Sequence, residues 1–159
     1  MAQRKSDCHG LPRIDGADVT ILQASWHSDI TDRMLAPCRE LLVQCGASDP
    51  TIHRVPGSLE LPIAAQTICR LTPRPEVIIA FGIILKGATD HYEVVRNECL
   101  RGLMDVMLRE DMPIIVEVLP VLSLEQAFER SADNEFNKGL EAARAAVDIV
   151  SLRRTLRAS

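Results

Sequence analysis

The chain has 159 residues and a net charge of −4, and 47% of its residues are apolar. This length and composition suit a single domain with a substantial core, and they exclude a disordered chain. The basic residues are scattered except for three arginines near the tail, so we expect no nucleic-acid partner. No apolar run approaches the roughly 20 residues of a membrane span, so we also expect no membrane partner.

The N-terminus and the cysteines bear on the cellular compartment. The opening sequence MAQRKSDCHG lacks the apolar segment of a signal peptide, which favours a cytoplasmic protein. The five cysteines are odd in number and form no C-x-x-C pair, a pattern typical of reduced thiols rather than disulfides or zinc ligands. Cys8 and His9 are adjacent, but two ligands do not complete a metal site.

Strand and helix patterns alternate along the chain from residue 19 onward. Val19 to Ser25 reads as a β-branched strand, and Asp29 to Cys45 repeats apolar residues at helical spacing, with a kink expected at Pro37. Thr51 to Val55 is predicted to be a short strand, and Ser58 to Leu71 a helix. The first half of the chain therefore predicts two strands that are each followed by a helix.

The second half repeats this order. Val77 to Leu85 is apolar throughout, as in a central parallel strand that is covered on both faces. The further predictions are a helix over Tyr92 to Leu108, a strand over Pro113 to Leu119, a helix over Leu124 to Arg130 capped by Ser123, and a terminal helix from about Asn137 to Leu156. The order predicts a three-layer α/β/α sandwich around a four-stranded parallel sheet of flavodoxin-like order, with residues 1–17 as an arm and 18–159 as one core.

Chemically distinctive residues follow the predicted strand ends, and the carboxyl ends of parallel strands are where ligands bind. Trp26, the only tryptophan, could stack on a planar heterocycle or simply cover the rim of the core. Glu60 could accept hydrogen bonds from a polyol, or it could be an acid that stabilises the start of a helix. Both residues thus have a binding interpretation and a structural one.

The segment from Lys86 to His91 contains a lysine, a glycine, a threonine hydroxyl and a histidine imidazole. It could receive a small anion at a helix N-terminus, or it could be an ordinary turn between strand and helix. Arg130 and Lys138 flank a break between helices, where they could face one pocket mouth or remain in solvent.

Five blocks of this sequence resemble lumazine synthase of the riboflavin pathway, in the same order. They are ASWH (24–27), VPGSLELP (55–62), FGIILKGATDHYEVV (81–95), EQAFER (125–130) and NKGLEAARAA (137–146). The resemblance covers about Val19 to Val150, and Trp26 together with VPGSLELP looks most similar to fungal-like members. It implies a transferase that condenses 5-amino-6-ribitylamino-2,4-pyrimidinedione with 3,4-dihydroxy-2-butanone 4-phosphate, giving 6,7-dimethyl-8-ribityllumazine without a cofactor or metal.

The same resemblance implies roles for individual residues. Trp26 would stack on the pyrimidine, Gly57 to Glu60 would hold the ribityl chain, and Ile83 to Leu85 would contact the pyrimidine edge. His91 would move protons, and Arg130 would balance the phosphate charge. The implied substrate-binding residues are Trp26, Gly57, Ser58, Leu59, Glu60, Ile83, Ile84, Leu85, Gly87, Ala88, Thr89, Val116 and Lys138. Arg130 and Lys138 would come from a neighbouring subunit of a homo-oligomer. A pentamer, a decamer and an icosahedral capsid of sixty subunits all remain open, and we favour a pentamer or a dimer of pentamers.

Several positions depart from the family pattern, and most of them cluster at the end of the fourth strand. Ser25, before Trp26, replaces a common arginine, and in the fourth strand region Val116 replaces a phenylalanine, Glu117 a glycine and Pro120 a threonine. Strand alternation sends Val116 and Glu117 to opposite faces, and we expect Glu117 to be an exposed carboxylate. These changes leave open a non-catalytic or weakly active paralogue that binds lumazine or flavin. An unrelated flavodoxin-like domain is disfavoured, because no hydroxyl-rich phosphate loop follows the first strand.

Overall fold

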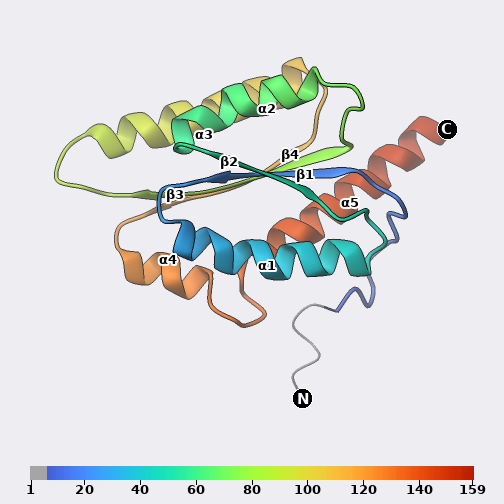
Figure 1. The fold of residues 1–159 in the computed structure, drawn as a ribbon, viewed down its shortest axis with the longest axis horizontal. Coiled ribbons are helices and arrows are strands. Elements are labelled where there is room, and N and C mark those ends of the chain that lie inside the picture. The colour runs from blue at the N-terminus through green and yellow to red at the C-terminus, as the bar shows by residue number, and fades with distance from the viewer. Residues whose placement is uncertain (1–6) are drawn as a thin grey trace.

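A computed structural model describes residues 7–159 of the chain, so the first six residues of the predicted arm lie outside the described part. Its centre is a four-stranded parallel sheet with the order β2-β1-β3-β4 (Figure 1). The strands are β1 (Val19–Ala24), β2 (Thr51–Val55), β3 (Val77–Leu85) and β4 (Ile114–Val121). The helices are α1 (Ser28–Gln44), the short 3-10 helix η1 (Ser58–Glu60), α2 (Leu61–Cys69), α3 (His91–Arg109), α4 (Leu124–Arg130) and α5 (Lys138–Ala158).

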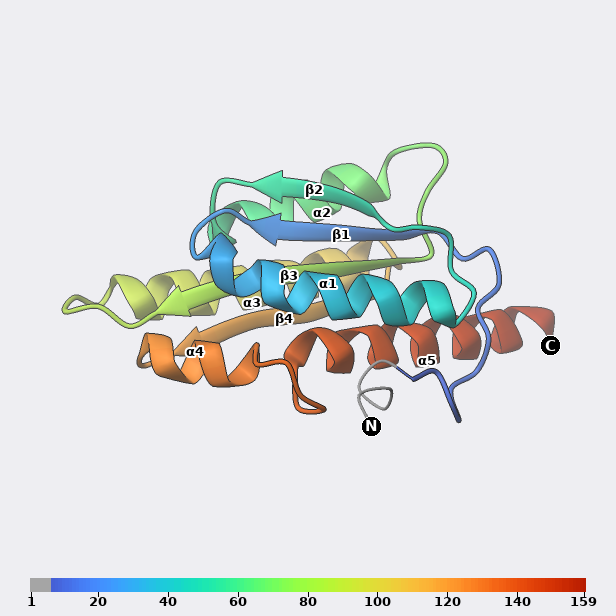
Figure 2. The ribbon, with the colours of Figure 1, turned by 60° about the horizontal axis from the view of Figure 1, so that its bottom comes forward.

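The sheet separates two layers of helices, as the sequence predicted. Helices α1 and α5 cover one face, and α2 and α3 cover the other (Figures 1 and 2). The side chains of β3 alternate between the two cores: Phe81 packs toward α1 and α5, whereas Ala80 packs toward α2 and α3. Both faces of β3 are therefore dry, which explains its continuous apolar sequence. Within the described residues, no helix combines the length and apolarity needed to cross a bilayer.

Most predicted elements are confirmed, with differences at proline residues. Helix α1 continues through Pro37 without interruption. The helix predicted from Ser58 begins instead as η1, and α2 follows with Pro62 in its first turn, where a missing N–H is tolerated. Strand β4 ends at Val121, two residues later than predicted, so Pro120 lies inside it. Because β4 is an edge strand in this chain, proline removes no required ladder bond there.

The start of α5 is held tightly against α1. A β-carbon added to Gly139 would overlap the carbonyl group of Met34, so only glycine permits this approach. Asn137 is buried and caps α5: its Oδ1 accepts from the Gly139 N–H at 2.8 Å, and its Nδ2 donates to the carbonyl oxygens of Ser131 at 3.0 Å and Arg33 at 3.2 Å. These contacts fix the position from which Lys138 leaves the backbone.

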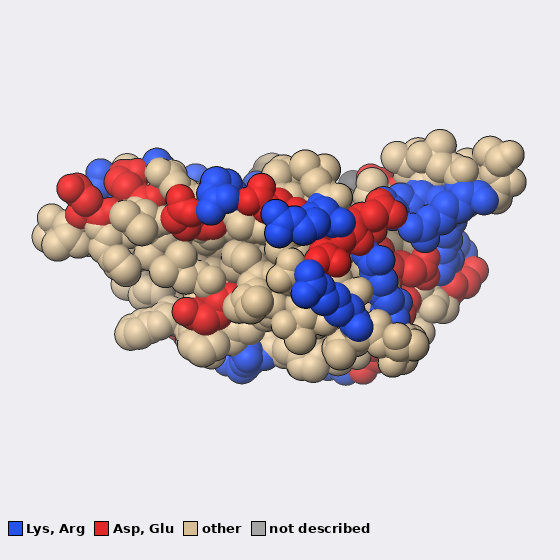
Figure 3. All heavy atoms as spheres, turned by 90° about the horizontal axis from the view of Figure 1, so that it is seen from above, with Lys and Arg blue, Asp and Glu red and all other residues tan. Residues whose placement is uncertain are grey.

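Charged side chains of both signs are mixed on the outer surface of α2 and α3 (Figure 3). Arg101 pairs with Glu98 at 2.6 Å and with Asp105 at 2.7 Å, and Arg70 pairs with Glu110 at 2.9 Å. Neighbouring charges therefore neutralise one another on this face instead of building a field of one sign.

Candidate active site

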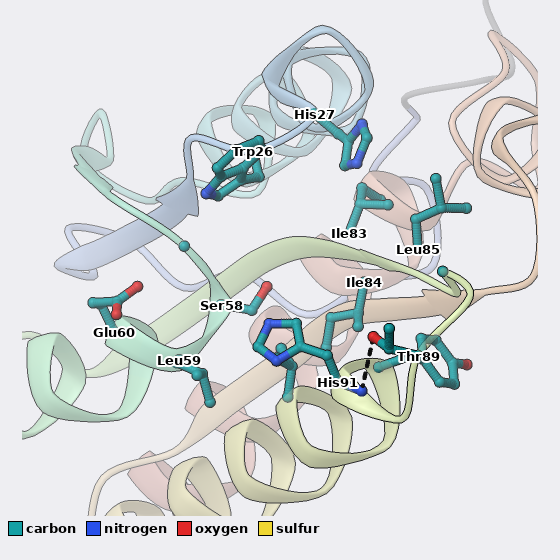
Figure 4. Close-up of a pocket in the computed structure, with 14 residues that line it drawn as sticks. Trp26, His27, Ser58, Leu59, Glu60, Ile83, Ile84, Leu85, Thr89 and His91 are labelled. Carbon is teal, nitrogen blue, oxygen red and sulfur yellow. Dashed lines mark hydrogen bonds between the residues drawn. The ribbon is translucent and has the colours of Figure 1, made fainter.

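A pocket of about 410 Å³ opens at the carboxyl edge of the sheet. It lies where β1, β2 and β3 end, the position at which parallel sheets bind ligands (Figure 4). Its lining comprises Trp26, His27, Gly57, Ser58, Leu59, Glu60, Ile83, Ile84, Leu85, Gly87, Thr89, His91, Tyr92 and Val95. Residues that follow three different strands therefore line one cavity, as their positions at strand ends predicted.

One wall is the turn between β1 and α1. His27 has a left-handed backbone with φ of 58°, and its carbonyl oxygen accepts the first hydrogen bonds of α1, from the N–H of Ile30 at 3.0 Å and of Thr31 at 3.2 Å. This tight turn presents both Trp26 and His27 to the pocket (Figure 4). Trp26 is 71% exposed, so its indole face is available for stacking on a flat ligand.

Two glycines allow η1 to approach the other elements of the pocket. A β-carbon on Gly57 would lie 3.1 Å from Glu60 Oε2 and 3.2 Å from Trp26 Cδ1, so the missing side chain leaves room between the indole and the carboxylate. A β-carbon on Gly82 of β3 would lie 2.9 Å from the Ser58 hydroxyl oxygen. The Ser58 hydroxyl of η1 therefore lies directly beside the second half of the central strand.

The opposite wall is the turn from β3 into α3. The Lys86 N–H donates to the Val121 carbonyl at 2.9 Å, which ties the start of this turn to β4. Beyond it, Gly87 has open space where a β-carbon would stand, and the Thr89 hydroxyl accepts from the His91 N–H at 3.4 Å (Figure 4). His91 begins α3 and lines the pocket with its imidazole, close to the positive end of the helix dipole.

Tyr92, in the first turn of α3, packs against two cations near this turn. The Lys86 ammonium lies 5.9 Å and the Arg96 guanidinium 5.4 Å from the centre of its ring. Such cation–π contacts favour positions near the aromatic face for both cations. Arg96 is also paired with Glu93 at 2.5 Å, so of these two cations Lys86 is the one that brings an uncompensated positive charge to the turn between β3 and α3.

Four predicted site residues lie outside this pocket in the single chain. Arg130 and Lys138 line a separate hollow of about 420 Å³ between α4 and α5. There, Arg130 donates to the Gln126 carbonyl at 3.0 Å, and Lys138 pairs with Glu141 at 2.6 Å. Ala88 does not line the pocket, and neither does Val116, which packs against the α2 and α3 core.

Glu117 differs from its prediction. It stands opposite Phe81 in the sheet register, on the face covered by α1 and α5, and it is partly buried. Burial raises its pKa to about 7, although the nearby Lys138 acts to lower it and Glu141 to raise it. Alternation does place Val116 and Glu117 on opposite faces, but the prediction of an exposed carboxylate is wrong because the first turn of α5 covers this position.

Three pocket residues are not among the predicted site residues: His27, Tyr92 and Val95. The position of His27, one residue beyond Trp26 at a strand end, was the available signal. Tyr92 and Val95 look like ordinary inner-face residues of a helix, and only the spatial approach of α3 to β3 reveals them. No group of three or more potential metal ligands occurs within residues 7–159.

Comparison with known proteins agrees with this geometry. A family model described as 6,7-dimethyl-8-ribityllumazine synthase matches residues 16–154. A protein of that name from Halorhodospira halophila is 35% identical over 150 residues, covering 93% of this chain and 96% of its own length. One from Azorhizobium caulinodans is 35% identical over 158 residues, covering 97% of each chain. With a parallel sheet, an edge pocket and sequence similarity along most of its length, the chain belongs to the 6,7-dimethyl-8-ribityllumazine synthase family.

Proposed function

We propose that the protein makes 6,7-dimethyl-8-ribityllumazine by condensing 5-amino-6-ribitylamino-2,4-pyrimidinedione with 3,4-dihydroxy-2-butanone 4-phosphate, with release of phosphate and water. One observation carries the proposal: Trp26, Glu60 and His91 line the same pocket although they are far apart in sequence. The pocket thereby combines an aromatic face, a carboxylate and an imidazole, which match a flat ring, a polyol and a reaction with several proton transfers.

The pocket offers each part of the substrates a matching surface. The exposed indole of Trp26 stacks on the pyrimidine, and Glu60 with the neighbouring polar groups of η1 accepts hydrogen bonds from the ribityl hydroxyls. The phosphate lies at the turn around Gly87 and Thr89, where the N-terminus of α3 favours an anion. Both reactants are then held side by side along the end of β3.

The reaction needs proximity and proton transfer. The substrate amine attacks the carbonyl carbon, and one water leaves to give an imine. Loss of a carbon-bound proton and of phosphate leaves an enol that becomes a ketone, and the ribitylamino nitrogen attacks this carbonyl and closes the ring with loss of a second water. Holding both reactants in one pocket converts a bimolecular encounter into an intramolecular step. The imidazole of His91 lines the pocket, so it can act as the general base and general acid during these steps.

The proposal includes a site shared between subunits of a homo-oligomer. Arg130 and Lys138 do not line the pocket of their own chain, but they line a hollow of about 420 Å³ on α4 and α5. Phe136 lines the same hollow, and its side chain is 75% exposed. A neighbouring subunit that covered this side chain would bring the two cations to the phosphate end of the next pocket, in a pentamer or a dimer of pentamers.

The activity is tested by mixing purified protein with both substrates and following the absorbance of the lumazine product. His91→Ala is expected to slow turnover strongly, because it removes the proton-transfer group. His53→Ala is the matched control, since His53 is exposed on β2 outside the pocket, and it should leave the rate unchanged. A wild-type rate equal to the uncatalysed background, with riboflavin still bound, would instead identify a lumazine- or flavin-binding paralogue.

The shared site is tested by mixing two inactive variants. His91→Ala damages the pocket, whereas Arg130→Ala damages the separate hollow. If neighbouring subunits complete one site, dissociating and reassembling the two variants together creates some pockets with both residues intact, and part of the activity returns. A mixture no more active than the two variants measured separately would refute the shared site.

A further inference from the structure

The N-terminal arm is fastened to the turn that ends α1. Residues 8–17 pass this turn before entering β1 (Figure 2). The Ile14 N–H donates to the Cys45 carbonyl at 2.9 Å, and the Gly16 N–H donates to the Gly46 carbonyl at 2.8 Å. Ile14 is fully buried in the same core cluster as Cys45. Both segments therefore have fixed backbone positions relative to each other.

Two free thiols meet where the arm crosses this turn. Cys45 is 1% exposed, whereas Cys8 is partly exposed and packs against the core cluster that contains Cys45. The side chains of Cys8 and Cys45 are within hydrogen-bonding reach of each other. The Leu11 N–H donates to the Cys8 carbonyl at 3.0 Å, which turns the chain and keeps Cys8 beside the turn.

Arg13 also fastens the arm to this turn. Its Nη1 donates to the Gln44 carbonyl at 3.3 Å, and its guanidinium is paired with Asp15 at 2.6 Å. The thiolate is the form of a cysteine that reacts with disulfides. Burial raises the pKa of Cys45 to about 11, while the more exposed Cys8 is the thiol that an oxidant in solution meets first.

We propose that Cys8 and Cys45 are a reversible redox pair, which forms an intramolecular disulfide when the protein meets a small disulfide oxidant such as oxidised glutathione. The Cys8 thiolate attacks one sulfur of the oxidant and expels a glutathione thiolate. The Cys45 thiolate then attacks Cys8 Sγ and expels the second glutathione. One protein disulfide forms, the oxidant is reduced to two thiols, and the arm becomes covalently fixed to the end of α1.

The test is oxidation of the full-length protein with oxidised glutathione, followed by intact-mass measurement and peptide mapping without reductant. The wild type is expected to lose the mass of two hydrogen atoms, to yield joined peptides containing Cys8 and Cys45, and to return to its starting mass with dithiothreitol. Closing this loop should raise the thermal midpoint by on the order of 5–10 °C. Cys69→Ser, the matched control, should behave like the wild type, whereas Cys8→Ser should form no internal bond.

Four results would overturn the redox pair. They are unchanged thiols after oxidation, a glutathione adduct that persists on Cys8, a bond that joins Cys8 to another subunit, and a disulfide between other cysteines. Cys8 is a partly exposed residue of the arm, so we expect Cys8→Ser to fold like the wild type. A missing disulfide in this variant can then be attributed to the missing thiol. The measurements do not depend on lumazine formation, so the redox pair can fail or succeed separately from the proposed function.

Discussion

Replacing Glu117 with glutamine tests how the carboxylate that β4 places beneath α5 affects stability. Burial raises the pKa of this group from 4.5 to about 7 in the folded protein. At a pH between 4.5 and about 7, Glu117 is therefore protonated in the folded protein, whereas in the unfolded chain it has already released its proton. Each pKa unit corresponds to about 1.4 kcal/mol, so the charged carboxylate lowers the free energy of unfolding by about 3 kcal/mol above pH 7.

The sign of the pH dependence follows from this proton. Below pH 4.5 both states are protonated and the elevated pKa has no effect, whereas stability falls as the pH rises from 4.5 to about 7. Glu117→Gln removes the titration. Relative to the wild type, the variant's free energy of unfolding should be about 3 kcal/mol larger at about pH 8 than at about pH 4, which means that the variant is relatively more stable at the higher pH.

Urea unfolding at both pH values, at one fixed protein concentration, measures this difference. Glu129→Gln, at an exposed position of α4, is the control and should change stability equally at the two pH values. Comparing pH values cancels any constant packing effect of the amide. If Glu117→Gln shifts stability by the same amount at both pH values, the carboxylate is not destabilised by burial and the reasoning is refuted.

Three further substitutions test the packing and the pocket. Gly139→Ala should lower the free energy of unfolding by about 3 kcal/mol or more, because the added β-carbon would overlap the Met34 carbonyl. Gly87→Ala is the control, since a β-carbon there meets open space and should leave the thermal midpoint nearly unchanged. Equal thermal midpoints for the two variants would contradict the close approach of α5 to α1. Asn137→Ala should cost about 2–3 kcal/mol in urea unfolding, since a buried cap and its carbonyl partners are lost. A loss below about 0.5 kcal/mol would show that water replaces these bonds. Trp26→Ala should weaken riboflavin binding about tenfold in calorimetry without changing stability, because stacking is lost from an exposed side chain; unchanged affinity would exclude stacking.

The sequence predicts the sheet well because its strands have strong local signals. Strand β3 matches its predicted bounds, since a continuous apolar run flanked by polar residues has no competing interpretation. The end of β4 was missed because proline normally argues against a strand, and only the edge position of β4 makes Pro120 acceptable. The pattern of apolar residues therefore predicts which strands form, whereas the position of a strand in the sheet decides where some of them end.

The sequence is enough to predict which residues share the pocket, but it is not enough to predict the burial of Glu117. Parallel strands bring Trp26, Glu60 and His91 to one edge, so strand ends and sequence order suffice to group them. Glu117 shows the opposite case. Alternation assigns its face correctly, but whether that face is covered depends on how closely α5 approaches, which is set by contacts distant in sequence such as that between Gly139 and Met34.

The single tryptophan has a spectroscopic consequence. Trp26 is the only tryptophan in the chain, and it lies with its ring exposed on the wall of the pocket. Indole emission excited at long wavelength therefore arises from the pocket alone, without background from the core. A flat ligand stacked on the ring should quench this emission in proportion to occupancy, so the unmodified protein carries its own optical probe for titrating the site.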